Sequence, residues 1–100
     1  MKKKIQILIV DDHFIVRIGL MTSLGMYPDL AVVAEASTGQ QAIELYRQHQ
    51  PDIVLMDVRL PDISGLEATA AIRKEFPGAR IIMISTYDGA DDIHRSFQVG

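Results

Sequence analysis

Cysteine is absent from the 100-residue chain. Disulfide frameworks and thiolate metal sites are therefore excluded, and a reducing compartment suits the sequence. Basic residues are not in excess either, because ten Lys and Arg stand against thirteen Asp and Glu, for a formal net charge of −3. Since neutralising a phosphate backbone needs a basic surface, this balance argues against nucleic-acid binding by the chain itself.

Long apolar runs are missing as well. The run that follows the basic start Met1-Lys2-Lys3-Lys4 ends at Asp11, so it is too short for the apolar region of a signal peptide or for a membrane span. No Gly/Ser/Pro-rich linker divides the chain. A composition that is 48% hydrophobic and 23% charged is globular. We therefore expect one cytoplasmic domain over residues 1–100, without membrane contact.

Short apolar runs alternate with helical patterns along the whole chain. The runs predicted to form strands are residues 5–10, 30–34, 53–56 and 80–84. The segments predicted to form helices are residues 13–24, 38–50, 64–76 and about 91–99, the last with Ile93 and Phe97 on its apolar face. Nearly continuous apolar strands that alternate with helices predict a parallel sheet covered on both faces.

Two of the predicted helices begin with capping boxes. Thr38 is followed three residues later by Gln41, and Ser64 by Glu67. In such a pair the hydroxyl accepts from a backbone N–H of the first turn, and the longer side chain reaches back to the start of the helix.

Acidic residues follow two of the predicted strands. Asp11 and Asp12 come after the first strand, and Asp57 comes after the third. An isolated Asp at such a place can simply cap the next helix. In a sheet of order 2-1-3-4, however, these strands are neighbours, and ligands bind outside the carboxyl ends of the strands. Three carboxylates would then converge, although two charges ~4 Å apart repel by roughly 4 kcal/mol at an effective dielectric near 20.

A cation would relieve this repulsion. Oxygen ligands without a His or Cys partner at suitable spacing indicate Mg²⁺, which phosphate oxygens commonly complete. Ser85 and Thr86 end the fourth predicted strand, where a hydroxyl either donates to a phosphoryl oxygen or merely ends the strand. His13 is expected to be a solvated residue of the first helical turn rather than a metal ligand.

These residues resemble the response-regulator receiver domain. The segments that carry the resemblance are Ile7-Leu8-Ile9-Val10-Asp11-Asp12-His13, Arg17-x-Gly19-Leu20, residues 54–67 from Val54 to Glu67, with Asp57, Pro61 and Gly65 in register, and Ile81-Ile82-Met83-Ile84-Ser85. The Asp-Asp-His start looks most like the NarL/FixJ subfamily. The resemblance implies a flavodoxin-like α/β three-layer sandwich, with strand order 2-1-3-4 here and 2-1-3-4-5 in a complete domain.

The resemblance also implies roles for individual residues. Asp57 would accept a phosphoryl group from a sensor histidine kinase. Asp12, Asp57 and the backbone carbonyl of Arg59 would ligate Mg²⁺, with Asp11 acting largely through water. Ser85 would hydrogen-bond the phosphoryl group, while Arg59 and Tyr87 would tune dephosphorylation. Such a domain is a signalling phosphoacceptor and not an enzyme in the usual sense.

The chain departs from the family pattern at its end. It stops at Gly100, before the fifth strand with its Lys and before the fifth helix. We therefore expect a helix-turn-helix domain further along a longer protein, and DNA contact only through it. The fourth strand is expected to be an uncovered apolar edge. More chain or a second subunit, as in a homodimer, would cover it.

Two other functions use similar residues. A Mg²⁺-dependent phosphohydrolase of the haloacid-dehalogenase type also has an Asp nucleophile on a parallel sheet, but its Asp-x-Asp follows the first strand. Here the two aspartates are adjacent, and the inferred acceptor follows the third strand. A receiver-like module used only for docking is the second alternative, because the strand-5 Lys is absent from this chain.

Overall fold

The computed structural model describes residues 3–85 and 97–99, which form one open sheet with helices on both faces. The strands are β1 (Ile5–Val10), β2 (Leu30–Ala36), β3 (Ile53–Asp57), β4 (Ile81–Ile84) and β5 (Phe97–Val99). The helices are α1 (Phe14–Gly25), α2 (Gly39–His49) and α3 (Gly65–Glu75).

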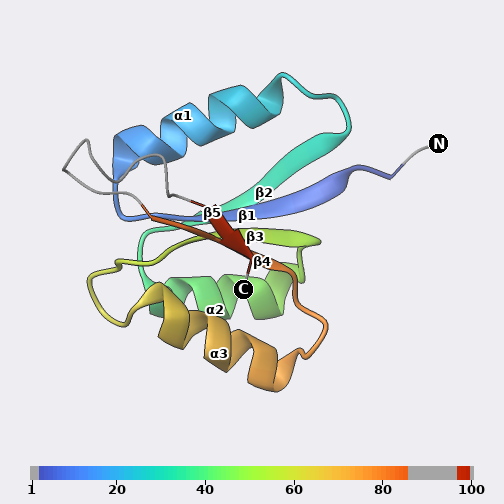
Figure 1. Cartoon of the computed structure of the whole chain (residues 1–100). Helices are drawn as coiled ribbons and strands as arrows, with labels where there is room; N and C mark the ends of the chain where they lie inside the picture. Colours follow the sequence, from blue (N-terminus) through green and yellow to red (C-terminus); the bar gives the residue numbers. More distant parts are fainter. Residues whose placement is uncertain (1–2, 86–96, 100) are drawn as a thin grey trace.

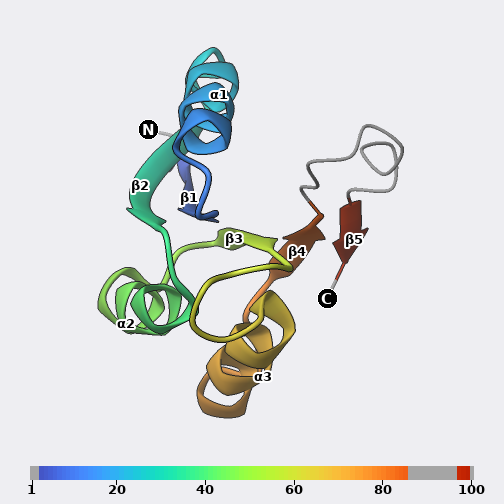
Figure 2. The ribbon, with the colours of Figure 1, turned by 90° about the vertical axis from the view of Figure 1, so that its left-hand side faces the viewer.

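The strand order in the sheet is β2-β1-β3-β4-β5, and the first four strands run parallel. Helix α1 lies on one face, over β1 and β2, whereas α2 and α3 lie on the other (Figure 1). Figure 2 looks onto the edge at which the parallel strands end. The predicted order 2-1-3-4 and the flavodoxin-like sandwich are thus confirmed.

The predicted helix over residues 91–99 is wrong at its end. Residues 97–99 form β5, which pairs antiparallel with β4 so that Phe97 lies opposite Ile84 and Val99 opposite Ile82. Residues 91–96, including Ile93, lie outside the described residues. An unpaired strand edge leaves backbone groups without partners, and Phe and Val favour strands. The edge of β4 that we expected to be uncovered is therefore paired along these residues.

Alternate residues of the strands form the core that α2 and α3 cover. The buried strand side chains of this core are Leu8, Val10, Ala36, Val54, Met56, Ile81 and Met83. Ala42, Ile43 and Tyr46 of α2, with Ala68 and Ile72 of α3, close the cluster. The carboxyl ends of β1 and β3 therefore rest on a packed core.

The caps of α2 and α3 follow the sequence pattern with one difference. At α3, Ser64 and Glu67 form the complete capping box. At α2, the Thr38 hydroxyl accepts from the backbone N–H of Gln41 at 3.1 Å, as predicted. The Gln41 side chain, however, accepts from the backbone N–H of Ser37 at 2.8 Å. The extended φ and ψ of Thr38 (−137° and 161°) place Ser37 in reach.

The pairing of β1 with β2 contains a shift of one residue. Ile7 lies opposite Val32, but Leu8 lies opposite Ala34, so Val33 has no counterpart in β1. Because side chains alternate between the two faces of a strand, the shift reverses the facing of everything that follows it in β2.

Candidate functional site

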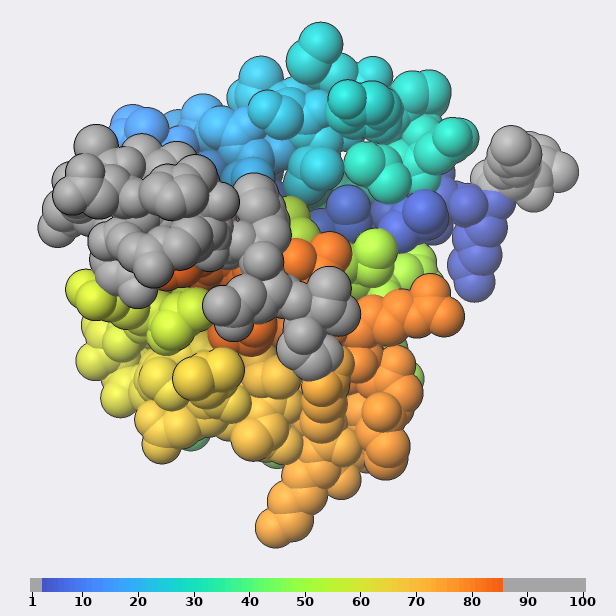
Figure 3. All heavy atoms as spheres, viewed as in Figure 1, coloured from blue at the N-terminus to red at the C-terminus, as the bar shows by residue number. Residues whose placement is uncertain are grey.

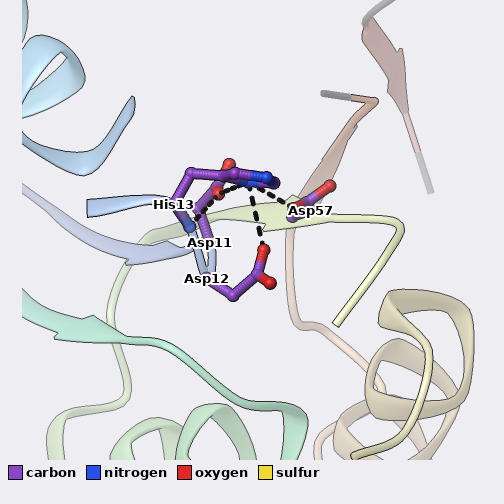
Figure 4. Close-up of side chains that lie close together, drawn as sticks. All are labelled: Asp11, Asp12, His13 and Asp57. Atoms are coloured by element: carbon purple, nitrogen blue, oxygen red, sulfur yellow. Dashed lines mark hydrogen bonds and ion pairs between the residues drawn. The ribbon is translucent and has the colours of Figure 1, made fainter. Parts of the chain in front are cut away.

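Two adjacent strands bring three carboxylates to one edge of the sheet. Val10 of β1 lies opposite Met56 of β3. The residues that follow them, Asp11 and Asp57, therefore lie next to each other at the carboxyl edge. Asp12 follows directly. One ligand atom from each of Asp11, Asp12, His13 and Asp57 lies within 4.8 Å of all the others (Figure 4).

Burial differs among the carboxylates. Asp11 and Asp57 are fully buried, whereas 36% of the Asp12 side chain is exposed. A buried carboxylate is stable only when it is paired or hydrogen-bonded. Asp11 accepts from the backbone N–H of His13 at 2.8 Å, and Asp57 accepts from the backbone N–H of Arg59 at 3.3 Å. Asp12 supplies the solvent-facing side of the group.

The imidazole of His13 lies among these carboxylates (Figure 4). Its Nδ1 is 2.9 Å from Asp11 Oδ1, 3.1 Å from Asp12 Oδ1 and 4.0 Å from Asp57 Oδ2. The hydrogen bond to Asp11 raises the pKa of His13 above 6.5, the nearby negative charges of Asp12, Asp11 and Asp57 add to this, and partial burial opposes it. The His13 side chain is 44% exposed, as the prediction of a solvated residue requires. That prediction did not include its contacts with the carboxylates.

Arg17 supports the acidic loop from α1. Its guanidinium donates to the backbone carbonyl of Asp11 at 2.7 Å and, through Nε, to the carboxylate of Glu35 at 3.0 Å. The Arg17 side chain is 15% exposed, which makes these charge-assisted bonds stronger than ordinary surface pairs. The loop that carries Asp11 and Asp12 is therefore tied to β2.

Gly65 lies directly against the phosphoacceptor candidate. A Cβ atom built at Gly65 would collide with the backbone carbonyl oxygen of Asp57. The Gly65 N–H donates to the carbonyl of Val58 at 2.8 Å. Only glycine permits this close approach.

The remaining candidates from the sequence lie around this edge. Ser85 directly follows Ile84, which ends β4 and is the register partner of Asp57, so it comes just after the end of the neighbouring strand at the same edge of the sheet. Arg59 lies two residues beyond Asp57, in the loop that leads to α3. Thr86 and Tyr87 lie outside the described residues.

The cluster fits a hard cation. Besides carboxylate oxygens it offers the imidazole Nδ1 of His13 and no sulfur, and two of its three carboxylates are fully buried. The expectation that no His stands at a suitable spacing is therefore wrong, because the His13 ring lies among the carboxylates. Oxygen ligands of this kind suit Mg²⁺, which keeps several waters and needs few protein ligands. Asp12, at the exposed side, leaves an entry path for such an ion.

Sequence reasoning missed the contacts of His13 and Arg17. The signal for His13 was its place beside Asp11 and Asp12 at a strand-to-helix junction. Arg17 lies one helical turn further on, and its partner Glu35 is on another strand, so no local pattern joins the two.

A parallel sheet with a carboxylate cluster at its carboxyl edge defines an α/β protein equipped to hold a cation next to a buried aspartate. Residues 7–100 match the model of the response regulator receiver domain, and the chain belongs to this family.

Individual relatives agree with this membership. The response regulator VraR of Staphylococcus saprophyticus is 36% identical over 96% of this chain. A LuxR-family response regulator from Aurantimonas is 44% identical in its solved structure, with a TM-score of 0.81, over 87% of this chain and 62% of that one. The receiver domain of a NarL regulator from Mycobacterium tuberculosis is 32% identical, also with a TM-score of 0.81, over 94% of this chain and 76% of that one. The NarL/FixJ resemblance is thus confirmed.

The chain spans about half the length of the curated relatives it matches, 46% in the case of VraR. Within the described residues, no helix has both the length and the apolar character needed to cross a membrane. The match favours the receiver family over the haloacid-dehalogenase alternative.

Proposed function

We propose that this chain is a phosphoacceptor domain of two-component signal transduction, in which Asp57 receives the phosphoryl group. The observation that carries the proposal is the buried carboxylate of Asp57 beside Asp11 and Asp12 at the carboxyl edge of the sheet. The donor would be a phosphohistidine of a sensor kinase, and the site of action the cytoplasm.

The transfer follows from the chemistry of the groups. A carboxylate oxygen of Asp57 attacks the phosphorus, and the phosphorus–nitrogen bond of the phosphohistidine breaks. The imidazole nitrogen leaves with the bonding pair and takes a proton, so an acyl phosphate remains on Asp57. Mg²⁺, when bound, would reduce the repulsion between the carboxylate and the phosphoryl oxygens.

Other residues of the chain would prepare this step. Asp12, Asp57 and the Arg59 backbone carbonyl would hold the ion, with Asp11 acting largely through water. Arg17 would keep Asp11 in place by donating a hydrogen bond to the backbone carbonyl of Asp11. The Ser85 hydroxyl would donate a hydrogen bond to the phosphoryl group. This bond would shift the population of the domain toward an active state. A DNA-binding domain elsewhere in a longer protein would read out this shift.

Phosphorylation by a small donor tests the proposal. With Mg²⁺ and acetyl phosphate, mass spectrometry of the protein should show one added phosphoryl group, labile in base. Asp57→Asn should reduce labelling to background, and chelation of Mg²⁺ should do the same. Asp29→Asn, which removes an exposed carboxylate in a turn far from the cluster, should label like the wild type.

Equal labelling of Asp57→Asn and wild type would overturn the proposal. Absence of labelling in the wild type, together with amide chemical shifts near Asp57 that do not respond to Mg²⁺, would instead favour a receiver-like module used only for docking.

A further inference from the structure

The loop between β3 and α3, residues 58–64, is held at both ends. At its start, the Val58 N–H donates to the carbonyl of Ile84 at 2.9 Å. At its end, the Gly65 N–H returns to the carbonyl of Val58 at 2.8 Å. The loop therefore closes next to Asp57, with Arg59 near its start and Asp62 in its second half.

Asp62 fixes the middle of this loop to a different helix. Its Oδ1 accepts from the backbone N–H of Gly39 at 2.7 Å, and its Oδ2 accepts from the backbone N–H of Gln40 at 2.8 Å. Both donors belong to the first turn of α2, where a helix leaves N–H groups without internal partners and favours negative charge. We refer to these two hydrogen bonds as the Asp62 clamp.

The clamp completes the start of α2. The Gln41 N–H is bonded to the Thr38 hydroxyl, so Asp62 and Thr38 together satisfy the N–H groups of Gly39, Gln40 and Gln41. The hydrogen bond from Gln40, followed by that from Gly39, holds the pKa of the Asp62 carboxyl below its usual value. The helix is thus fully capped only when the loop is in place.

An apolar contact accompanies the clamp. A Cβ atom built at Gly39 would collide with the side chain of Ile63, so the helix start and the loop are in direct contact at two successive loop residues. One contact is polar and the other apolar, and together they fix both the distance and the orientation of the loop.

We propose that Asp62 is a positioning residue, whose clamp on α2 sets the loop so that the backbone carbonyl of Arg59 reaches the cation beside Asp57. This inference rests on the proposed function, because it assigns a role toward the same ion. Arg59 lies between two fixed points, the Asp62 clamp and the hydrogen bond from its own N–H to Asp57 Oδ1 at 3.3 Å. Groups that hold metal ligands in place typically contribute 10–100-fold to affinity.

A matched pair of substitutions tests the inference. Asp62→Ala removes the clamp, whereas Thr38→Ala removes the local cap of the same helix and leaves the loop contact intact. We expect Asp62→Ala to weaken Mg²⁺ binding about tenfold, measured by amide chemical-shift titration. Thr38→Ala should change the Mg²⁺ Kd by less than about twofold, although it also removes a hydrogen bond that caps α2.

Two further variants separate positioning from folding. Asp62→Asn keeps one acceptor oxygen, so its Mg²⁺ Kd should lie between those of wild type and Asp62→Ala. Gly39→Ala keeps the Asp62 carboxylate but places a methyl group against the Ile63 side chain and 3.4 Å from Asp62 Oδ1. It should weaken Mg²⁺ binding while α2 itself gains a better helix former. Saturating Mg²⁺ should restore the rate of labelling by acetyl phosphate in each. Because Mg²⁺ would also stabilise a partly unfolded variant, thermal melting without Mg²⁺ should show that each variant is folded at the temperature of the titration.

Amide hydrogen exchange in the metal-free protein gives an independent readout. Exchange of residues 59–63 should be faster in Asp62→Ala than in Thr38→Ala. Equal Mg²⁺ affinities and equal loop exchange in these two variants would overturn the inference, while normal labelling of the wild type would leave the proposed function standing. A wild type that neither binds Mg²⁺ nor becomes labelled would overturn the proposed function first.

Discussion

On one face of the sheet, α2 and α3 contribute buried residues, among them Ile43, Tyr46 and Ile72. On the opposite face lies α1, which falls wholly within the described part of the chain and has no buried residue. Phe14 and Ile15 of α1 are exposed. In Figure 3, the atoms of α1, in blue, and those of α3, in yellow and orange, lie on opposite sides of the molecule.

The difference shows that apolar composition does not by itself bury a helix. Val16, Leu20 and Leu24 of α1 recur every four residues, and each is only half-buried. Among the described residues, the main contacts of α1 are with β1 and β2, whereas α2 also packs on α3 and shares a continuous core with it. The carboxylate site depends on helices from both faces. Gly65 of α3 lies against the Asp57 carbonyl, and Arg17 of α1 donates to the Asp11 carbonyl.

The largest expected effect contrasts the same substitution on the two faces. Ile72→Ala in α3, at a side chain only 1% exposed, should lower the free energy of unfolding by ~2–5 kcal/mol because it leaves a cavity. Ile18→Ala in α1, at a side chain 41% exposed, should cost less than about 1 kcal/mol. Denaturant titration of both variants measures this, and equal losses would refute the contrast.

A pair of glycine substitutions sharpens the comparison. Gly65→Ala should destabilise the fold by about 1–3 kcal/mol, because its methyl group meets the Asp57 carbonyl. It should also reduce labelling of Asp57. Gly19→Ala, in the middle of α1 with no described atom within 4 Å of the added Cβ, should stabilise by roughly 0.5–1 kcal/mol. Thermal melting checks both signs, and a stabilised Gly65→Ala would contradict the close approach.

The smallest effect concerns pH at the start of α2. The backbone N–H groups of Gln40 and Gly39 hold the pKa of Asp62 below its usual value. A carboxyl with a lowered folded pKa stabilises the protein above the unfolded value, near pH ~4, and this stabilisation is lost as the pH falls through the folded pKa.

The Tm difference between wild type and Asp62→Asn should therefore shrink between neutral pH and about pH 3. Thr38→Ala is the control, since it removes no titratable group and its Tm difference from wild type should stay nearly constant. If the Tm of wild type stayed equally far above that of Asp62→Asn in acid, the ionised Asp62 carboxylate would not be the source of the stabilisation.

The sequence predicted the elements whose patterns are local. The run from Ile5 to Val10 and the capping box at Ser64 both appear where expected, because alternation and capping act over a few residues. The convergence of Asp11 and Asp57 also follows from strand order. The contacts of Arg17 with Glu35 and of Asp62 with α2 join segments about 20 residues apart, and no periodicity encodes them.

The misplaced segment at residues 97–99 has a related cause. Its helical spacing is a local signal, while the backbone of β4 offers a partner that only the folded sheet provides. Tertiary pairing overrides a short, marginal helical pattern.

The unmatched Val33 in β2 has a consequence for the whole acidic edge. If Val33 were instead paired with Leu8 in continuous register, Val10 would stand opposite Glu35, whose carboxylate would then point into the hydrocarbon layer beneath α2. With the shift, Glu35 stands opposite Ile9 on the α1 side, where it accepts a hydrogen bond from Arg17. The skipped residue thus sets which face the end of β2 presents, and the anchoring of Asp11 depends on it.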